Sequence, residues 1–151
     1  MTIIGKNKHK IQFRKIDNIM EFENLKNICF DLDFWKEHKN RIISSKKYIG
    51  IIINAELSLE ELNLNYKLFD LIKIKFDTFK NGRGFTLARK LREDYKFKKD
   101  IRATGHVLPD QYHFMIRCGF SSFEINTSEK KTWEKVIKYS ITSHYQQTNF
   151  D

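Results

Sequence analysis

Short runs of residues typical of strands alternate along this chain with segments typical of helices, and the connections between them are short. The clearest strand is Tyr48–Asn54, which contains Ile49 and the run Ile51-Ile52-Ile53. Leu71–Phe76 alternates apolar residues with lysine, as a strand that exposes one face or one edge would. Because parallel strands need crossover connections, this alternation predicts βαβ units and a mainly parallel sheet.

The remaining pattern supplies three more strands and five helices. The other strands are expected at residues 27–30, 101–104 and 120–126. The helices are expected at residues 31–44 (capped by Asp31 or Asp33), from Ser58 with capping-box spacing to Glu61, at residues 85–95, from Pro109 to Gly119, and after Thr127 or Ser128. About five strands form a small open α/β sheet or half of a (β/α)₈ barrel, and are too few for a closed barrel.

The length of 151 residues fits one hydrophobic core. We expect an N-terminal arm or short strand over residues 1–25, a single α/β domain over 26–145 and a tail over 146–151. If the sheet is a half-barrel, its open edges favour a homodimer or cover by the arm.

The chain shows no sign of export or of a membrane span. No stretch approaches the roughly 18 apolar residues that a span needs, and the first eight residues lack the apolar core of a signal peptide. Cys29 and Cys118 are far apart without metal-type spacing, and the five histidines are dispersed. These features predict a cytoplasmic protein with no metal site, and they name no cofactor.

A net charge of +9 is typical of nucleic-acid-binding proteins, but here it is weak evidence for such binding. Lysine outnumbers arginine 21 to 7 and isoleucine outnumbers valine 19 to 2, a bias that AT-rich codons impose. The lysines are also spread along the chain. Five of the seven arginines fall within residues 83–117, and a planar guanidinium is a specific ligand for anions. A solvated basic surface is therefore preferred over a nucleic-acid site, which stays an alternative.

The best place for an anion is the segment Phe79–Thr86, whose glycines bracket Arg83 before a predicted helix. Glycine permits close backbone approach, and a helix start offers free N–H groups. The spacing fits neither a Rossmann turn nor a P-loop, so a plain turn is the alternative. In such folds ligands bind at the carboxyl ends of the strands, where the loop of residues 105–111 also lies.

These two loops supply the candidate site residues. We expect an anion or cofactor to be bound by Gly82, Arg83, Gly84, Thr86, Gly105 and Gln111. His106 and Asp110 are the candidates for proton transfer, with an exposed histidine and a helix-capping aspartate as the alternatives.

Three motifs in order, residues 79–92, 102–111 and 117–120, resemble the bacterial domain-of-unknown-function family 934. The similarity is strongest over residues 71–126 and continues in register from about residue 28. Three positions depart from the usual family pattern: Asn81 and His106 replace aspartate, and Pro109 replaces arginine. Arg83, Gly82, Gly105, Asp110 and Gln111 match it.

The resemblance implies a role in assimilatory sulfite reduction, as an oxidoreductase or an accessory protein whose partner is sulfite reductase or another sulfur-assimilation protein. With two cysteines the chain cannot supply a four-cysteine iron–sulfur site, which favours the accessory role. The alternatives are a small barrel-like enzyme acting on an anionic metabolite, with Arg83 binding the anion and His106 moving a proton, and a basic module that binds nucleic acid or another partner.

Overall fold

The computed structural model describes residues 1–6, 9–78 and 82–148, and from residue 140 onward the backbone alone. Its strands are β1 (Thr2–Gly5), β2 (Arg14–Lys15), β3 (Asn27–Asp31), β4 (Tyr48–Asn54), β5 (Leu71–Phe76), β6 (Asp100–Gly105) and β7 (Ser122–Ile125). The helices are α1 (Leu32–Ser44), α2 (Leu59–Leu62), α3 (Arg83–Glu93), α4 (Tyr112–Cys118) and α5 (Lys130–Thr148). Short 3₁₀ turns are η2 (Ile19–Glu21), η3 (Tyr66–Leu68), η4 (Pro109–Gln111) and η5 (Thr127–Glu129).

The described strands form one sheet in the order β1-β7-β6-β5-β4-β3-β2. From β3 to β7 the spatial order is the chain order and each pair is parallel, whereas β1 pairs with β7 antiparallel. A parallel sheet that advances one strand at a time curls into a barrel, and here it forms a half-barrel. The predicted α/β class with a mainly parallel sheet is confirmed, and of the two predicted forms, open sheet or half-barrel, the sheet is a half-barrel.

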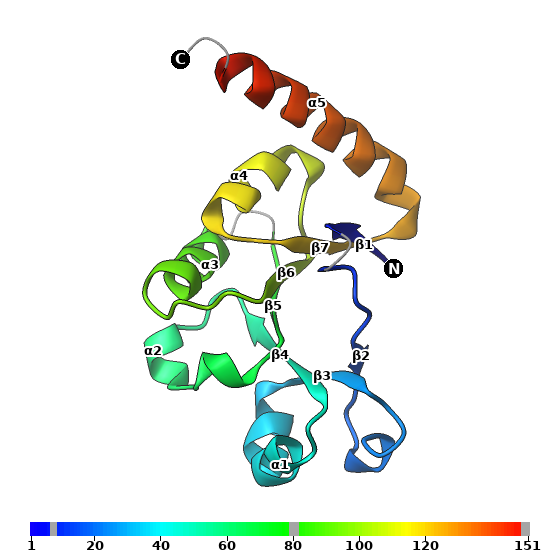
Figure 1. Ribbon diagram of the computed structural model, residues 1–151, viewed down its shortest axis with the longest axis vertical. Coiled ribbons are helices and arrows are strands. Elements are labelled where there is room, and N and C mark those ends of the chain that lie inside the picture. Colours follow the sequence, from blue (N-terminus) through cyan, green and yellow to red (C-terminus); the bar gives the residue numbers. More distant parts are fainter. Residues whose placement is uncertain (7–8, 79–81, 149–151) are drawn as a thin grey trace.

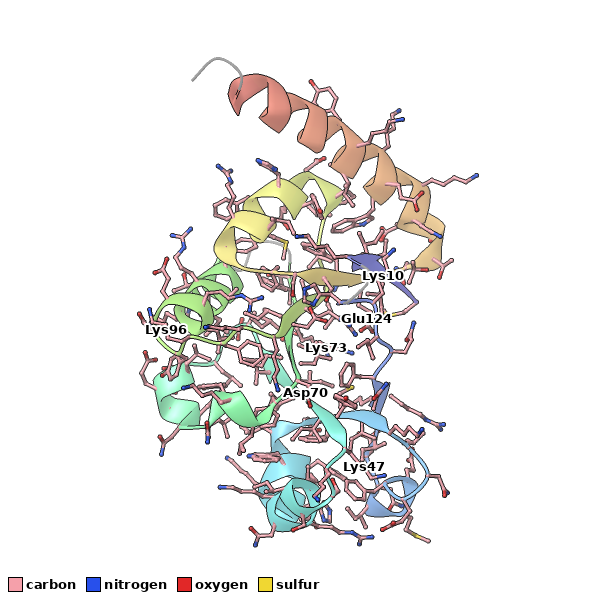
Figure 2. All side chains as sticks on the ribbon, in the orientation of Figure 1. Lys10, Lys47, Asp70, Lys73, Lys96 and Glu124 are labelled. Atoms are coloured by element: carbon pink, nitrogen blue, oxygen red, sulfur yellow. The ribbon has the colours of Figure 1, made fainter. Side chains whose placement is uncertain are left out.

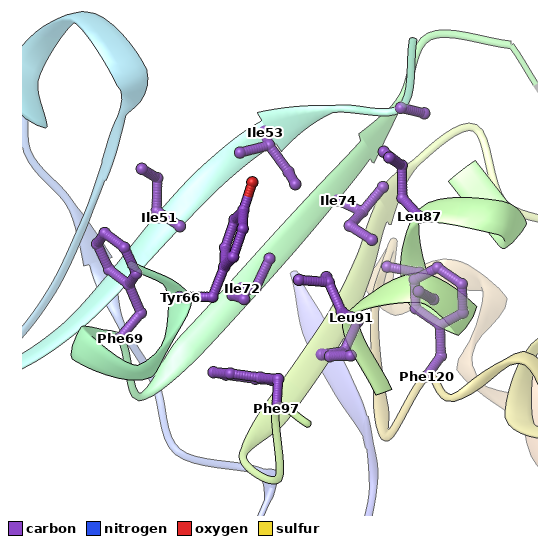
Figure 3. Packing of buried hydrophobic residues seen from close by; sticks show 14 of the residues in the cluster. Ile51, Ile53, Tyr66, Phe69, Ile72, Ile74, Leu87, Leu91, Phe97 and Phe120 are labelled. Atoms are coloured by element: carbon purple, nitrogen blue, oxygen red, sulfur yellow. The ribbon is translucent and has the colours of Figure 1, made fainter. Parts of the chain in front are cut away.

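The convex face of the sheet carries the hydrophobic core. In Figure 1, α1 to α4 lie on one side of the sheet, and α5 crosses α4 at one end. Figure 3 shows Ile51 and Ile53 of β4 and Ile72 and Ile74 of β5 facing the helix layer. Each of these four side chains is at most 1% exposed. Burying an aliphatic side chain of this size contributes roughly 1.5–3 kcal/mol, so this face holds the fold together.

The described residues of the N-terminal arm, 1–6 and 9–16, lie on the opposite, concave side of the sheet. They supply both edge strands, β1 beside β7 and β2 beside β3. Figure 1 shows this N-terminal arm running along the side of the sheet away from α1 to α4. Arg102 Nη2 donates to the carbonyl groups of His9 and Ile11, both at 3.0 Å. The arm is therefore bonded to the middle of the sheet as well as to its edges.

Several predicted helix ends differ in the structure. Asp31 is the cap of α1, since its Oδ1 accepts from the N–H of Phe34 at 2.9 Å, as predicted. The Ser58 capping box is wrong, because the Ser58 hydroxyl donates to Glu60 instead of bonding the helix backbone. Thr127 and Ser128 are also not caps: both lie within η5, whose N-cap is Asn126.

Candidate functional site

The described part of the glycine-rich segment, residues 82–86, follows β5 and forms the start of α3. Residues 79–81, including Asn81, lie outside the described part. Gly82 precedes the helix and Arg83 is its first residue, two positions earlier than predicted. Arg83 and Thr86 line a shallow pocket of about 250 Å³ together with Ser58, Glu60 and Lys90. Helix α3 therefore aims Arg83 at the α2 side of the molecule.

Two glycines of the predicted site are required by packing. A Cβ on Gly84 would lie 2.2 Å from Cε1 of Phe76, so only glycine lets that ring reach the helix. Gly105 has a φ of +88°, and a Cβ there would lie 2.3 Å from the carbonyl oxygen of Phe76. Both positions are explained by the fold, and their contact with an anion stays a prediction.

The second predicted loop follows β6 at the same edge of the sheet. His106 is exposed, and its backbone N–H donates to the carbonyl of Phe76 at 2.8 Å. Asp110 is exposed within η4, and Gln111 is half-buried at the residue before α4. The roles of His106 and Asp110 in proton transfer stay predictions.

The concave face carries a second polar group of residues, which the sequence did not single out. Alternation along the inner strands turns every second side chain to this face. The inward polar residues of the last three strands are Lys73, Lys75, Asp100, Arg102, Thr104, Ser122 and Glu124. In a half-barrel this face is partly enclosed, so Lys73, Asp100 and Arg102 are buried, whereas Glu124 is half-buried and Lys75 is exposed.

At the amino end of the strands, the inward charges hold the arm in place. Arg102 is 1% exposed and pairs with Asp100 at 3.0 Å. Its Nε donates to Ser122 Oγ at 2.9 Å, and that hydroxyl donates to Asp100 at 2.8 Å. Arg102 and Asp100 neutralise each other, and the arm carbonyls accept further hydrogen bonds from Arg102. The burial of these charges is therefore explained by their role in holding the arm.

Nearer the carboxyl end, Lys73 reaches the centre of the concave face. Its Nζ lies 2.7 Å from Oε2 of Glu124 on β7 and 3.9 Å from Sγ of Cys29 on β3. These strands lie on opposite sides of β5, and neither is its neighbour, so both reach one ammonium because the sheet curls. Figure 2 shows Lys73 and Glu124 together at the middle of the sheet. Burial raises the pKa of the Cys29 thiol, although the Lys73 charge opposes the shift.

A pocket of about 540 Å³ opens above this pair at the carboxyl end of the half-barrel. Strands β3 to β7 all contribute to its wall. Its lining residues are Lys15, Asp31, Leu32, Asp33, Ile52, Asn54, Leu57, Lys73, Lys75, Thr104 and Glu124. We call it the half-barrel pocket. Its position is the one at which barrel and open-sheet α/β proteins bind ligands.

Lys75 and Thr104 are register partners on β5 and β6, and both line the half-barrel pocket. Thr104 is 9% exposed, and no hydrogen bond of its hydroxyl is found within the described residues. The Lys75 ammonium likewise has no ion pair or hydrogen bond to any described residue. An ammonium and a nearly buried hydroxyl thus offer adjacent donor groups to whatever enters the pocket.

The sequence feature that contains Lys73 and Lys75 is the alternation Leu-Ile-Lys-Ile-Lys-Phe in β5. From the sequence, this alternation indicates a strand with one face or one edge exposed to solvent. In the structure Lys73 is only 6% exposed. It is buried because the sheet curls, and the curvature of a sheet cannot be predicted from the residue pattern of one strand.

The described residues contain no helix long and apolar enough to cross a membrane. Over the same part of the chain, no group of three or more histidine, cysteine, aspartate or glutamate residues is placed to hold a metal ion.

Comparison with known proteins places the chain at the level of family. Searches of curated proteins and of solved structures find no match. Residues 50–151 match the family described as bacterial protein of unknown function, DUF934. This range contains β5, α3, β6, α4 and β7. Most residues that line the half-barrel pocket lie within it. The chain belongs to the DUF934 family.

Proposed function

We propose that the protein binds a small oxyanion at Lys75 and Thr104 in the half-barrel pocket, and that it supports assimilatory sulfite reduction. The observation that carries this proposal is the adjacent pair of donors without partners among the described residues. Sulfite carries three oxygen acceptors on one sulfur atom, which suits an ammonium and a hydroxyl side by side. Sulfite as the ligand rests on the family resemblance, which implies sulfur assimilation.

The charges of the pocket favour Lys75 over Lys73 as the anion ligand. The ammonium of Lys73 is already neutralised by Glu124 at 2.7 Å, whereas that of Lys75 has no ion pair within the described part of the chain. An anion at Lys75 therefore displaces no ion pair between described residues. Asn54, the other register partner of Lys75, donates its amide to Asp77 at 2.6 Å and is already engaged.

The segment around Arg83 is the alternative location for the oxyanion. It offers a guanidinium and the amino end of α3, a helix of 11 residues. Carboxylates line both pockets: Glu56 and Glu60 beside Arg83, and Asp31, Asp33 and Glu124 in the half-barrel pocket. We place the oxyanion in the half-barrel pocket because Lys75 has no ion pair among the described residues, and we keep Arg83 as the comparison in the test.

An accessory role, with sulfite reductase or another sulfur-assimilation protein as partner, fits this chain better than the six-electron reduction itself. Its two cysteines are both buried, at 0% and 2% exposure, on separate elements. They cannot together supply a four-cysteine cluster site.

Isothermal titration with sulfite at fixed ionic strength tests the binding site. Removing one charge-assisted hydrogen bond costs about 1.5–3 kcal/mol, so Lys75→Gln should weaken binding by about 10- to 100-fold. Thr104→Val, which keeps the shape of the side chain, should weaken it less. Lys67→Gln, on the exposed turn η3, is the charge-matched control and should change little.

Three results would count against parts of the proposal. Loss of binding in Arg83→Gln with normal binding in Lys75→Gln would move the oxyanion to α3. Binding of nucleic acid with a steep salt dependence, and none of sulfite, would favour the basic-module alternative. In a bacterium that carries the gene, a deletion strain should grow on sulfide but not on sulfite. Normal growth on both would remove the link to sulfite reduction.

The homodimer expected from the open barrel edges also stays a proposal. Here β1 and β2 form the two edges of the sheet, and β2 has only two residues. Sedimentation equilibrium would detect a dimer.

A further inference from the structure

Lys73 has no part in the oxyanion site proposed above, yet it lines the same pocket. Its side chain is 8% exposed, and its amine contacts Glu124 and Cys29. Lys73 and Lys75 are alternate residues on the same face of β5 and line the same pocket, so one small ligand has both amines on one side of it.

Stability alone is a weak reason for this ion pair. Replacing a buried ion pair by apolar residues of similar volume is often neutral or stabilising, since desolvation offsets most of the attraction. The other buried pair of this face, Asp100 and Arg102, has a further use because Arg102 bonds the arm. The pair of Lys73 and Glu124 bonds no part of the arm in the described contacts, and it borders an open pocket instead.

We infer that Lys73 forms an imine with the carbonyl group of a small 2-oxo acid, whose carboxylate is held by Lys75 and Thr104. The seat of the carboxylate rests on the proposed oxyanion site, whereas the reaction at Lys73 does not. Lysine is suited to this reaction, and it needs an adjacent base to release the amine from its proton. Glu124, at 2.7 Å from Nζ, is that base.

The reaction needs no oxidant or reductant. Glu124 accepts one proton from the Lys73 ammonium, and the neutral amine adds to the carbonyl carbon, forming a C–N bond. The carbonyl oxygen takes up protons from Glu124 and from the amine and leaves as water. The product is a protonated C=N bond between Lys73 and the carbon skeleton of the 2-oxo acid. Charge is conserved, since an ammonium has become a protonated imine.

Trapping with pyruvate and cyanoborohydride tests this inference directly. Reduction of the imine fixes the adduct, which adds the mass of pyruvic acid less one oxygen atom to the protein. We expect one such addition per chain, located on Lys73 by peptide sequencing in the mass spectrometer. Acetone, which has the ketone without the carboxylate, should label Lys73 far more slowly. Labelling spread over the exposed lysines, with none on Lys73, would overturn the inference.

Variants separate the parts of the inference. Glu124→Gln keeps the shape of the side chain and removes the base, so labelling should slow by roughly 100-fold, a usual effect of losing a general base. Lys73→Arg keeps the charge next to Glu124 and should abolish the adduct. Lys75→Gln should slow labelling by pyruvate but not by acetone, and an equal rate with pyruvate would exclude Lys75 as the carboxylate ligand. Circular dichroism shows whether each variant is folded. The trapping of pyruvate on Lys73 in the wild-type protein does not depend on the variants.

This test and that of the proposed function fail separately. Labelling of Lys73 in a protein that does not bind sulfite would overturn the proposed function alone. Sulfite binding that depends on Lys75, without any adduct on Lys73, would overturn this inference alone.

Discussion

The guanidinium of Arg102 donates a hydrogen bond to the backbone carbonyl of Ile11 at 3.0 Å, joining the centre of the sheet to a residue 91 positions earlier. The same nitrogen bonds the carbonyl of His9, and the Phe13 ring lies 5.9 Å from the guanidinium carbon. One buried side chain thus fixes the arm across the half-barrel. Farther along the arm, Lys15 lines the half-barrel pocket.

Substituting Arg102 by methionine should destabilise the protein by about 3–5 kcal/mol, because Asp100 would remain buried without its partner. Urea unfolding measures the change, and hydrogen exchange of residues 9–13 should speed up with it. Arg14→Met is the control, since Arg14 is 68% exposed and its loss should change the unfolding free energy by at most about 0.5 kcal/mol. Equal effects of the two variants would show that Arg102 does not anchor the arm.

Alanine should destabilise the protein at Gly84 but not at Gly82. A Cβ on Gly84 meets the Phe76 ring at 2.2 Å, so overpacking should cost about 1–3 kcal/mol. A Cβ on Gly82 meets nothing within 4 Å, and its φ of −68° suits alanine, so this variant should be neutral or up to about 1 kcal/mol more stable. Thermal unfolding of the two variants measures the change in stability for each. A stable Gly84→Ala protein would mean that Phe76 does not pack against α3.

The Glu60 carboxyl should titrate well below a normal glutamate. Its own backbone N–H, the Ser58 hydroxyl and the Lys90 ammonium stabilise the carboxylate and lower its pKa to about 2. Because the folded-state pKa is lowered, the ionised form favours folding above the ordinary pKa, and this contribution is lost as the pH falls towards 2. Carbon-13 NMR titration of the carboxyl group measures it. Ser58→Ala should raise the pKa, and an unchanged value would exclude the hydroxyl as a cause.

The Cys29 thiol should react slowly in the folded protein. It is 0% exposed, and burial raises its pKa, although Lys73 lowers it in part. The folded protein keeps the thiol protonated to higher pH than the unfolded chain does. Stability should therefore fall as the pH rises above the ordinary thiol pKa of about 8.5. Alkylation with iodoacetamide, followed by mass spectrometry across that pH range, checks both points. Labelling at neutral pH at the rate of a free thiol would contradict the buried position.

The strand and helix pattern predicted the fold because it is a local property. Apolar runs such as Tyr48–Asn54 form strands wherever a sheet can bury them, and Gly119 ends its helix with a φ of +117° as the sequence predicted. Helix ends were less predictable. Thr127 and Ser128 lie within a 3₁₀ turn, since a cap depends on the direction in which the chain enters the helix.

The candidate site was predicted in part. The loops with Arg83 and His106 follow β5 and β6 at the carboxyl edge of the sheet, as the order of elements required. The sequence does not single out the inward residues Lys75 and Thr104, because the pattern of residues 71–76 indicates an exposed face or edge and that of residues 101–104 indicates only a short strand. Only the register of β5 and β6 shows that these two side chains are neighbours.

The sequence by itself determined the α/β class, the order of strands and helices, the edge of the sheet at which loops gather and the family. These follow from local periodicity, turn residues and short motifs, which lie within a few residues of one another. The tertiary structure decided which lysine is buried, which glycines are needed for packing and where the arm lies. Each of these depends on sheet curvature and on contacts between residues far apart, such as Lys73 with Cys29 and Glu124.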